Sequence, residues 1–251
     1  MTDLRPARDA MVATLGLTRE PVAVKFLTEK TGSGDYQELP RRRYCQMVME
    51  AGRGRKVLLT ADNITCPAAA AAFGFKPLPP KLASGEMLAA FGIFGSPEAG
   101  QATLNSMRRL EQGRYAAVAL APLGEQDFEP DVIVIEGTVE QLMWLALAAR
   151  YETGGRAQFT TAILQATCED TTVLPFVTGE LNATLGCYGC RDATDLGEDE
   201  AVIGFPATIL EAVVHGLREL SAKALPHVRA KLAYSRLEEC PAAEASDKEQ
   251  E

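Results

Sequence analysis

Histidine is scarce in this sequence, because its 251 residues include only His215 and His227. Two histidines leave little room for a Ser-His-Asp triad, and no Gly-x-Ser-x-Gly segment is present to hold a nucleophilic serine. A Walker A motif and a Gly-x-Gly-x-x-Gly loop after a strand are missing as well. The sequence therefore lacks the common signatures of serine hydrolases, phosphate-binding loops and dinucleotide sites.

Positive charge is in deficit, because 25 Lys and Arg residues face 34 Asp and Glu residues, for a net charge of −9. A general nucleic-acid binder needs a basic face, so we expect no nucleic-acid partner. Basic residues do cluster at 41–43 and 53–56. The two interpretations are a solvated helix flank and a positive rim that receives an anionic partner.

Long apolar runs are also missing. None reaches the roughly 18–20 residues that span a bilayer, so we expect no membrane segment. Residues 1–17 lack the apolar core and cleavage pattern of a signal peptide. We therefore expect a cytoplasmic protein, in a compartment that keeps thiols reduced.

Apolar segments of strand and helix length alternate along the chain, which favours an α/β or α+β fold. We expect a single domain over 1–240, with a mixed sheet flanked by helices, and a disordered acidic tail over 241–251. The expected strands are 21–27, 57–60, 116–120, 131–135, 182–185 and 201–204. The expected helices are 4–17, 44–51, 68–73, 87–93, 97–110, 139–151, 160–168 and 206–223. The two histidines fall on C-terminal helical segments and are poor ligand candidates.

The six cysteines carry the clearest chemical signal. Cys187 and Cys190 are three residues apart, a spacing that places two sulfurs on one metal. Gly189 between them allows a tight turn that frees backbone N–H groups to stabilise thiolates. The residues after Cys190 predict a loop.

Single cysteines complete the set. Cys66 precedes Pro67 at a predicted helix start, where the positive end of the helix dipole should lower the pKa of its thiol. Cys45 lies near another predicted helix start. Cys168 lies in or at the end of a helix, followed by Glu169 and Asp170, which we interpret as solvated surface charge. Cys240, at the tail boundary, is expected to have no role.

A ligand set made only of cysteines suits structural zinc or an iron–sulfur cluster. Structural zinc draws on two close pairs, whereas one pair here accompanies scattered single cysteines. The hypothesis is a [4Fe–4S]-type cluster held by Cys45, Cys66, Cys187 and Cys190, with Cys168 as an alternate ligand. Arg43 and Arg191 are the expected positive neighbours of the cofactor. This site would serve redox chemistry, electron transfer or cluster-assisted small-molecule binding.

Other functions stay open at this stage. They are a zinc-stabilised module without catalysis and a thiol enzyme that uses Cys66. A thioredoxin-like use of Cys187 and Cys190 is disfavoured, since that motif should begin a helix. The expected partner is a redox protein or a small molecule. The sequence sets no oligomeric state, and a homodimer is compatible with it.

These cysteine segments resemble the domain-of-unknown-function family 169, the uncharacterised ArCR group. The resemblance extends from about residue 20 to about residue 225, and its most specific element is Cys187-Tyr188-Gly189-Cys190-Arg191. The other matching segments are Tyr44-Cys45-Gln46, Cys66-Pro67-Ala68-Ala69, Asp131-Val132-Ile133-Val134, Cys168-Glu169 and Ile203-Gly204-Phe205-Pro206. The resemblance implies one domain with cysteine-bearing motifs, in line with redox biology, and names no substrate.

Overall fold

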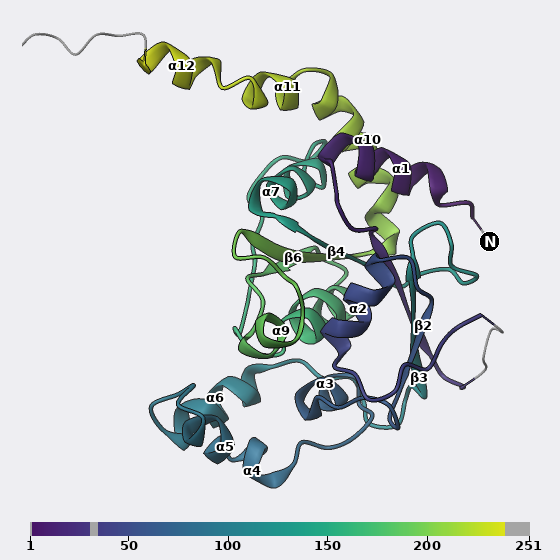
Figure 1. Ribbon diagram of the computed structural model, residues 1–251, viewed down its shortest axis with the longest axis vertical. Coiled ribbons are helices and arrows are strands. Elements are labelled where there is room, and N and C mark those ends of the chain that lie inside the picture. Colours follow the sequence, from purple (N-terminus) through teal and green to yellow (C-terminus); the bar gives the residue numbers. More distant parts are fainter. Residues whose placement is uncertain (1, 31–34, 239–251) are drawn as a thin grey trace, which may run out of the picture.

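The structure is a computed structural model that describes residues 2–30 and 35–238. Its strands form one six-stranded sheet in the order β2-β3-β1-β4-β6-β5 (Figure 1). The strands are β1 (Val22–Leu27), β2 (Val57–Thr60), β3 (Ala117–Pro122), β4 (Val132–Thr138), β5 (Asn182–Thr184) and β6 (Glu200–Pro206). The predicted class, an α/β or α+β fold with helices flanking one sheet, is confirmed. The expected tail and Cys240 lie outside the described residues.

The direction of the strands differs from the expected mixed sheet. All five pairings between the named strands are antiparallel. A buried strand reads as a continuous apolar run in either direction, so the sequence pattern of these segments carries no signal for direction.

Helices cover both faces of the sheet. Successive side chains of a strand point to opposite faces, and in most of these strands both sets are mainly apolar and buried. In β1, Val22, Val24 and Phe26 belong to one apolar cluster, while Ala23 belongs to a second. The first cluster includes residues of helices α2 (Tyr44–Gly52) and α3 (Pro67–Ala72), and the second includes residues of α1 (Arg5–Leu15), α7 (Val139–Ala148) and α10 (Leu210–Ala222). The sheet is thus the middle layer of three.

The described chain contains helices of several kinds. The α-helices up to β4 are α1 (Arg5–Leu15), α2 (Tyr44–Gly52), α3 (Pro67–Ala72), α4 (Pro80–Ala83), α5 (Glu86–Ala90) and α6 (Pro97–Ser106). Those after β4 are α7 (Val139–Ala148), α8 (Leu174–Thr178), α9 (Tyr188–Ala193), α10 (Leu210–Ala222), α11 (Ala224–Arg229) and α12 (Leu232–Glu238). A π-helix η1 (Ala166–Val173) and a 3₁₀ turn η2 (Ala207–Ile209) complete the set.

The helix predicted over 160–168 is wrong for its first six residues. Residues 160–165 form no helix, and η1 begins at Ala166. Residue Gln165, which precedes η1, has a left-handed backbone with φ of 54°. The hydroxyls of Thr171 and Thr172 donate to the Thr167 carbonyl at 3.1 and 2.7 Å, which stabilises this wide turn.

Close packing of η1 on β6 requires glycine at position 204. A Cβ built there would lie 1.8 Å from the Thr171 carbonyl oxygen, far inside any real contact. The glycine therefore lets the π-helix lie directly against the sheet. This contact fixes the depth at which the π-helix carries Cys168.

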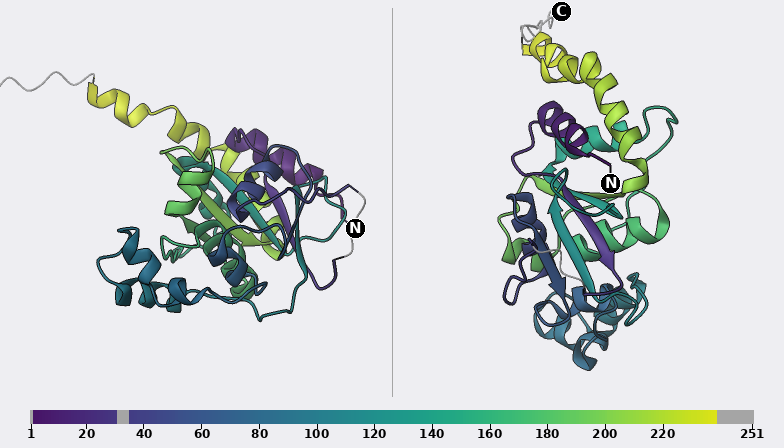
Figure 2. Two further views of the ribbon diagram at one scale, coloured as in Figure 1. Left: turned by 60° about the horizontal axis from the view of Figure 1, so that its bottom comes forward. Right: turned by 90° about the vertical axis from the view of Figure 1, so that its right-hand side faces the viewer.

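Two groups of helices stand away from the sheet. Helices α4 to α6 lie at one end of the molecule and have their own small apolar cluster, while α11 and α12 project from the opposite end (Figures 1 and 2). Across residues 2–30 and 35–238, no helix combines the length and apolar character needed to cross a bilayer.

Candidate functional site

Five cysteines from separate parts of the chain line one cavity of about 210 Å³. Cys45 lies in the first turn of α2, Cys66 precedes α3, and Cys168 lies on η1. Cys187 precedes α9 and Cys190 lies within it. We call this space the cysteine cavity. The four predicted ligands and the predicted alternate ligand therefore share one location.

Helix starts place two of these cysteines. Arg43, which precedes α2, has an extended backbone whose N–H donates to Gln46 Oε1 at 3.0 Å, so the helix begins one residue before Cys45. At α3, Cys66 is extended and Pro67 occupies the first helical position, where the missing N–H of proline costs nothing. Both helix starts agree with the sequence prediction.

The segment after Cys187 is helical as far as Ala193, so the loop predicted beyond Cys190 is wrong for residues 191–193, whereas residues 194–197 form no helix. Cys187 is the N-cap of α9, and its Sγ accepts a hydrogen bond from the Cys190 N–H at 3.3 Å. The glycine that turns the chain into this helix is Gly186, with φ of 83°, whereas Gly189 lies inside the helix. A six-residue helix shows too little apolar periodicity to be predicted.

The sulfur atoms of the cysteine cavity are in direct contact at α9. Cys187 Sγ and Cys190 Sγ are 3.3 Å apart, and the Thr167 hydroxyl lies 3.3 Å from Cys190 Sγ. The thiol of Cys45 also hydrogen-bonds to Cys190. Cys190 is 4% exposed, so these contacts replace water as its hydrogen-bond partners.

Hydrogen bonding between the thiols makes one of the five more acidic than the others. Hydrogen bonds from Cys187 and Cys45 lower the pKa of Cys190. The same bonds to Cys190, followed by burial, raise the pKa of Cys45 and of Cys187. Burial raises the pKa of Cys168 as well. Cys190 is therefore the most acidic of the thiols that line the cavity.

The expected lowering of the Cys66 pKa is wrong. Burial raises the pKa of the Cys66 thiol, and the backbone N–H groups of Ala69 and Ala68 lower it only in part. Desolvation disfavours the charged form of a buried thiol, and here it exceeds the effect of the helix start. A nucleophile needs a lowered pKa, so this environment does not activate Cys66.

The two predicted arginines occupy different positions. Arg43 lines the cysteine cavity, and its Nη1 donates to the Gly189 carbonyl at 2.8 Å and pairs with Asp192 at 3.2 Å. Arg191 is not among the lining residues. Its guanidinium donates to the carbonyls of Leu185, Gly197 and Glu200, at 2.6 to 3.1 Å. Arg191 therefore holds the chain on either side of α9 in place.

The described sulfur atoms do not form a ready-made site for a single ion. Within residues 2–30 and 35–238, no group of three or more His, Cys, Asp or Glu side chains has an arrangement that could hold a metal ion. His215 is exposed and lies 3.0 Å from Glu152, and neither histidine lines the cysteine cavity. The donor set at the cavity is thiol sulfur.

The interpretation of Glu169 and Asp170 as surface charge is wrong. The residues are 4% and 2% exposed, on the π-helix directly after Cys168. Glu169 accepts from the Arg108 N–H at 3.0 Å, and Asp170 accepts from the hydroxyls of Thr161 and Thr184 at 2.7 and 2.9 Å. Burial raises the pKa of Glu169 to about 8. The one feature of the nearby sequence that could have indicated a buried, hydrogen-bonded polar segment is the pair of threonines that follows, Thr171 and Thr172.

Comparison with known proteins shows the family of this chain. The model of the Uncharacterised ArCR family, domain of unknown function 169, matches residues 10–216, so the chain belongs to that family. A relative is an uncharacterized protein of Methanocaldococcus jannaschii, 32% identical over 221 residues, a match that covers 86% of this chain and 94% of the relative. No solved structure matches this chain.

Proposed function

We propose that this ArCR-family chain holds a cysteine-ligated metal cluster of the [4Fe–4S] type in the cysteine cavity. The ligands would be Cys45, Cys66, Cys187 and Cys190, with Cys168 as the alternate. One observation carries the proposal: thiols from four remote segments of the sequence line the same small space. A large apolar core has no need to gather cysteines, and a lone buried cysteine is usually an ordinary core residue.

The size of the cavity favours a cluster over one zinc ion. A space of about 210 Å³ is many times larger than the minimum that holds one water molecule. A structural zinc ion is enclosed at about 2.3 Å from each of four sulfurs and leaves no such space. The contact of 3.3 Å between Cys187 and Cys190 would have to open for either metal, as the two sulfurs move apart toward the cavity.

The residues around the cavity would stabilise ionised sulfur. Backbone N–H groups of Ala68 and Ala69 interact with Cys66, and the Cys190 N–H donates to Cys187. The positive charge of Arg43 favours the thiolate of Cys66. Such hydrogen bonds and charges tune the potential of sulfur-ligated sites.

Apolar side chains close the opposite wall of the cavity. They come from the α4–α6 region and include Leu82, Met87, Leu88, Phe91 and Leu104. This wall would exclude water from the metal. When bound, an iron–sulfur cluster supplies one-electron redox chemistry or an iron that binds a substrate. A redox protein or a small molecule is the corresponding partner.

Anaerobic purification tests the proposal. We expect about four iron and four sulfide per chain, with broad absorbance near roughly 400 nm. The variants Cys45→Ser, Cys66→Ser and Cys187→Ser should lose most of the iron and the absorbance. Cys240→Ser is the matched control and should retain both. Colourless protein that also fails to take up iron and sulfide on anaerobic reconstitution would contradict the proposal.

A dithiol redox pair at Cys187 and Cys190 is the second candidate. It is favoured by the sulfur separation of 3.3 Å and by a position between β5 and α9, the strand-to-helix context of such motifs. The low-pKa member, Cys190, is however buried, which hinders attack on an outside disulfide. The test is oxidation of the metal-free protein, followed by a count of free thiols. A loss of two thiols in the natural chain, and of none in Cys190→Ser, would favour this candidate.

A further inference from the structure

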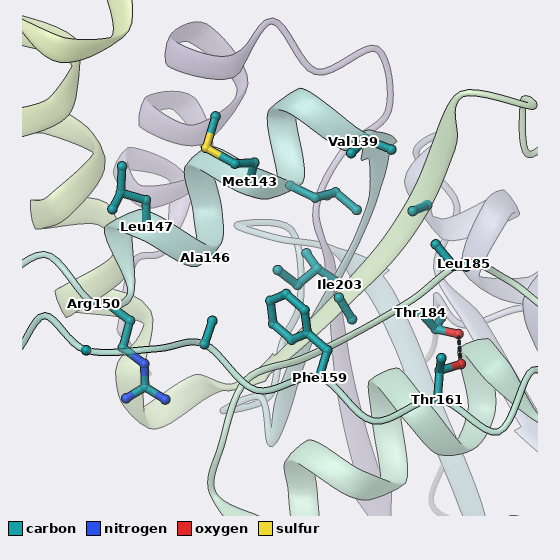
Figure 3. Close-up of a pocket in the computed structure, with 15 residues that line it drawn as sticks. Val139, Met143, Ala146, Leu147, Arg150, Phe159, Thr161, Thr184, Leu185 and Ile203 are labelled. Atoms are coloured by element: carbon teal, nitrogen blue, oxygen red, sulfur yellow. Dashed lines mark hydrogen bonds between the residues drawn. The ribbon is translucent and has the colours of Figure 1, made fainter.

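A second pocket, of about 520 Å³, lies between α7 and the edge of the sheet formed by β5 and β6 (Figure 3). Met143 and Leu147 of α7 form one wall, and Ile203 of β6 lies opposite. Phe159 points into the space from the segment 153–162. We call this space the apolar pocket. Its volume falls within the range of small-molecule sites.

The walls of the apolar pocket expose side chains that a folded protein normally buries. Val139, Met143, Leu147, Phe159 and Leu185 are 43–62% exposed, and all five line this pocket. Single exposed apolar residues are ordinary on a protein surface, whereas a contiguous group marks a binding surface. The group is continuous here because α7, β5 and the 153–162 segment face one another.

Positive charge lies at one end of the apolar pocket. Arg150 lines the apolar pocket and also a polar cleft beside it, to which Arg108 and Arg156 contribute. Arg150 pairs with Glu180 at 3.1 Å, but both side chains are exposed, so that pair is weak and replaceable. The cleft is also lined by the carboxyl groups of Glu169, Asp170 and Glu180, and Arg108 interacts electrostatically with Glu169, so Arg150 is the cation that a ligand of the apolar pocket would meet. An anion at this end would meet the Arg150 guanidinium, a group that can bind a carboxylate in a bidentate fashion.

We propose that the apolar pocket binds an amphipathic carboxylate of the fatty-acid class, with its hydrocarbon chain between α7 and β6 and its carboxylate at Arg150. A hydrocarbon chain would cover the exposed apolar walls, which stabilises the complex by about 25 cal/mol per Å² of apolar surface buried. The adjacent polar cleft leaves the carboxylate in contact with water and arginine. This site needs no metal and is separate from the cysteine cavity.

The strand β5 connects the two sites along the chain. Ala183, Thr184 and Leu185 line the apolar pocket, and Cys187 follows two residues later. The Leu185 carbonyl accepts hydrogen bonds from Arg191 of α9 at 2.6 and 3.1 Å. A ligand that displaces Leu185 would therefore move the chain that carries Cys187.

Fluorescence of dansyl-labelled undecanoic acid, titrated with the full chain, tests the proposal. We expect the emission to rise and shift to shorter wavelength on binding, and dodecanoate to displace the probe at least fivefold more effectively than dodecylamine. Met143→Asp should weaken probe binding at least about tenfold, because it places a charge beside the hydrocarbon chain. Arg150→Gln should weaken it about two- to fivefold, the range of an exposed charge pair.

Val177→Asp is the matched control, because Val177 is also an exposed apolar residue but lies outside the pocket. It should leave probe binding unchanged. Absence of probe binding, equal displacement by dodecylamine, or equal weakening by Val177→Asp would overturn the proposal. Sedimentation of the unliganded chain tests whether a second copy covers the pocket. A dimer that Met143→Asp dissociates, in a chain that does not bind the probe, would show such a copy and would also overturn the proposal.

Discussion

The substitution Gly204→Ala should separate the π-helix from the sheet and thereby disturb the cysteine cavity. The added Cβ would lie 1.8 Å from the Thr171 carbonyl oxygen and 2.6 Å from its carbonyl carbon. Real contacts do not fall below 3.0 Å, so the two backbones must move apart by more than 1 Å. Neither moves easily, because β6 is hydrogen-bonded on both sides, to β4 and to β5. We expect a cost at or above the upper end of the 1–3 kcal/mol typical of overpacking, thus about 3 kcal/mol.

Thermal and urea denaturation of the metal-free chain would measure this cost. A loss of about 3 kcal/mol corresponds to a fall in melting temperature of about 6–12 °C for a chain of this size. Gly95→Ala is the matched control, since a Cβ there meets nothing within 4 Å and should change stability little. Equal stability of the Gly204→Ala and Gly95→Ala variants would refute the close approach of η1 and β6, and with it the described position of Cys168.

Three further substitutions test other parts of the structure. Burial raises the pKa of Glu136 from 4.5 to about 7, so the folded state favours the protonated carboxyl. The free energy of unfolding is therefore highest below about pH 4.5 and falls as the pH rises through about 7. Urea titrations at pH 5 and pH 8 would measure this fall in the free energy of unfolding, which is at most about 3 kcal/mol, and Glu136→Gln should remove it. Asp170→Ala should cost about 2–3 kcal/mol by chemical denaturation, because the hydroxyls of Thr161 and Thr184 lose the acceptor that they share. Arg191→Met should release the chain around α9 and raise the hydrogen-exchange rate of α9 amides, with little change in α7.

Helices and strands could be predicted from the sequence where the spacing of apolar residues determines them. The β1 segment alternates between two apolar clusters, and the α2 and α10 segments carry apolar residues at helical spacing, so both kinds of element were predicted close to their observed bounds. Strand direction was not predictable, because it depends on tertiary pairing. The π-helix was not predictable either, because its stability comes from threonine hydroxyls that bond to the Thr167 carbonyl and from the space that Gly204 leaves.

For the candidate site, the sequence predicted which cysteines come together but not their charge state. Cysteine spacing and the predicted helix starts named the five cysteines that line the cysteine cavity. The charge state of those residues was not predictable. Cys66 has the local sequence of an activated thiol, yet its pKa is raised, because burial depends on the α4–α6 helices that cover it. Likewise, Glu169 and Asp170 look like surface residues in the sequence, and only the fold places the Arg108 N–H beside Glu169 and the hydroxyls of Thr161 and Thr184 beside Asp170.

Unfavourable backbone geometry is concentrated in the segment that joins the two candidate sites. Ile163 and Gln165 are two of the four non-glycine residues with positive φ in the described chain, and the π-helix begins directly after them. Such geometry costs of order 1–3 kcal/mol per residue and persists where surrounding structure enforces it, most often at functional sites. On one side, this segment presents Thr167 and Cys168 to the cysteine cavity, and on the other it borders the apolar pocket through Thr161. A fold selected for stability alone would have a regular helix here. The irregular segment is therefore best explained by the positions that it gives to these side chains.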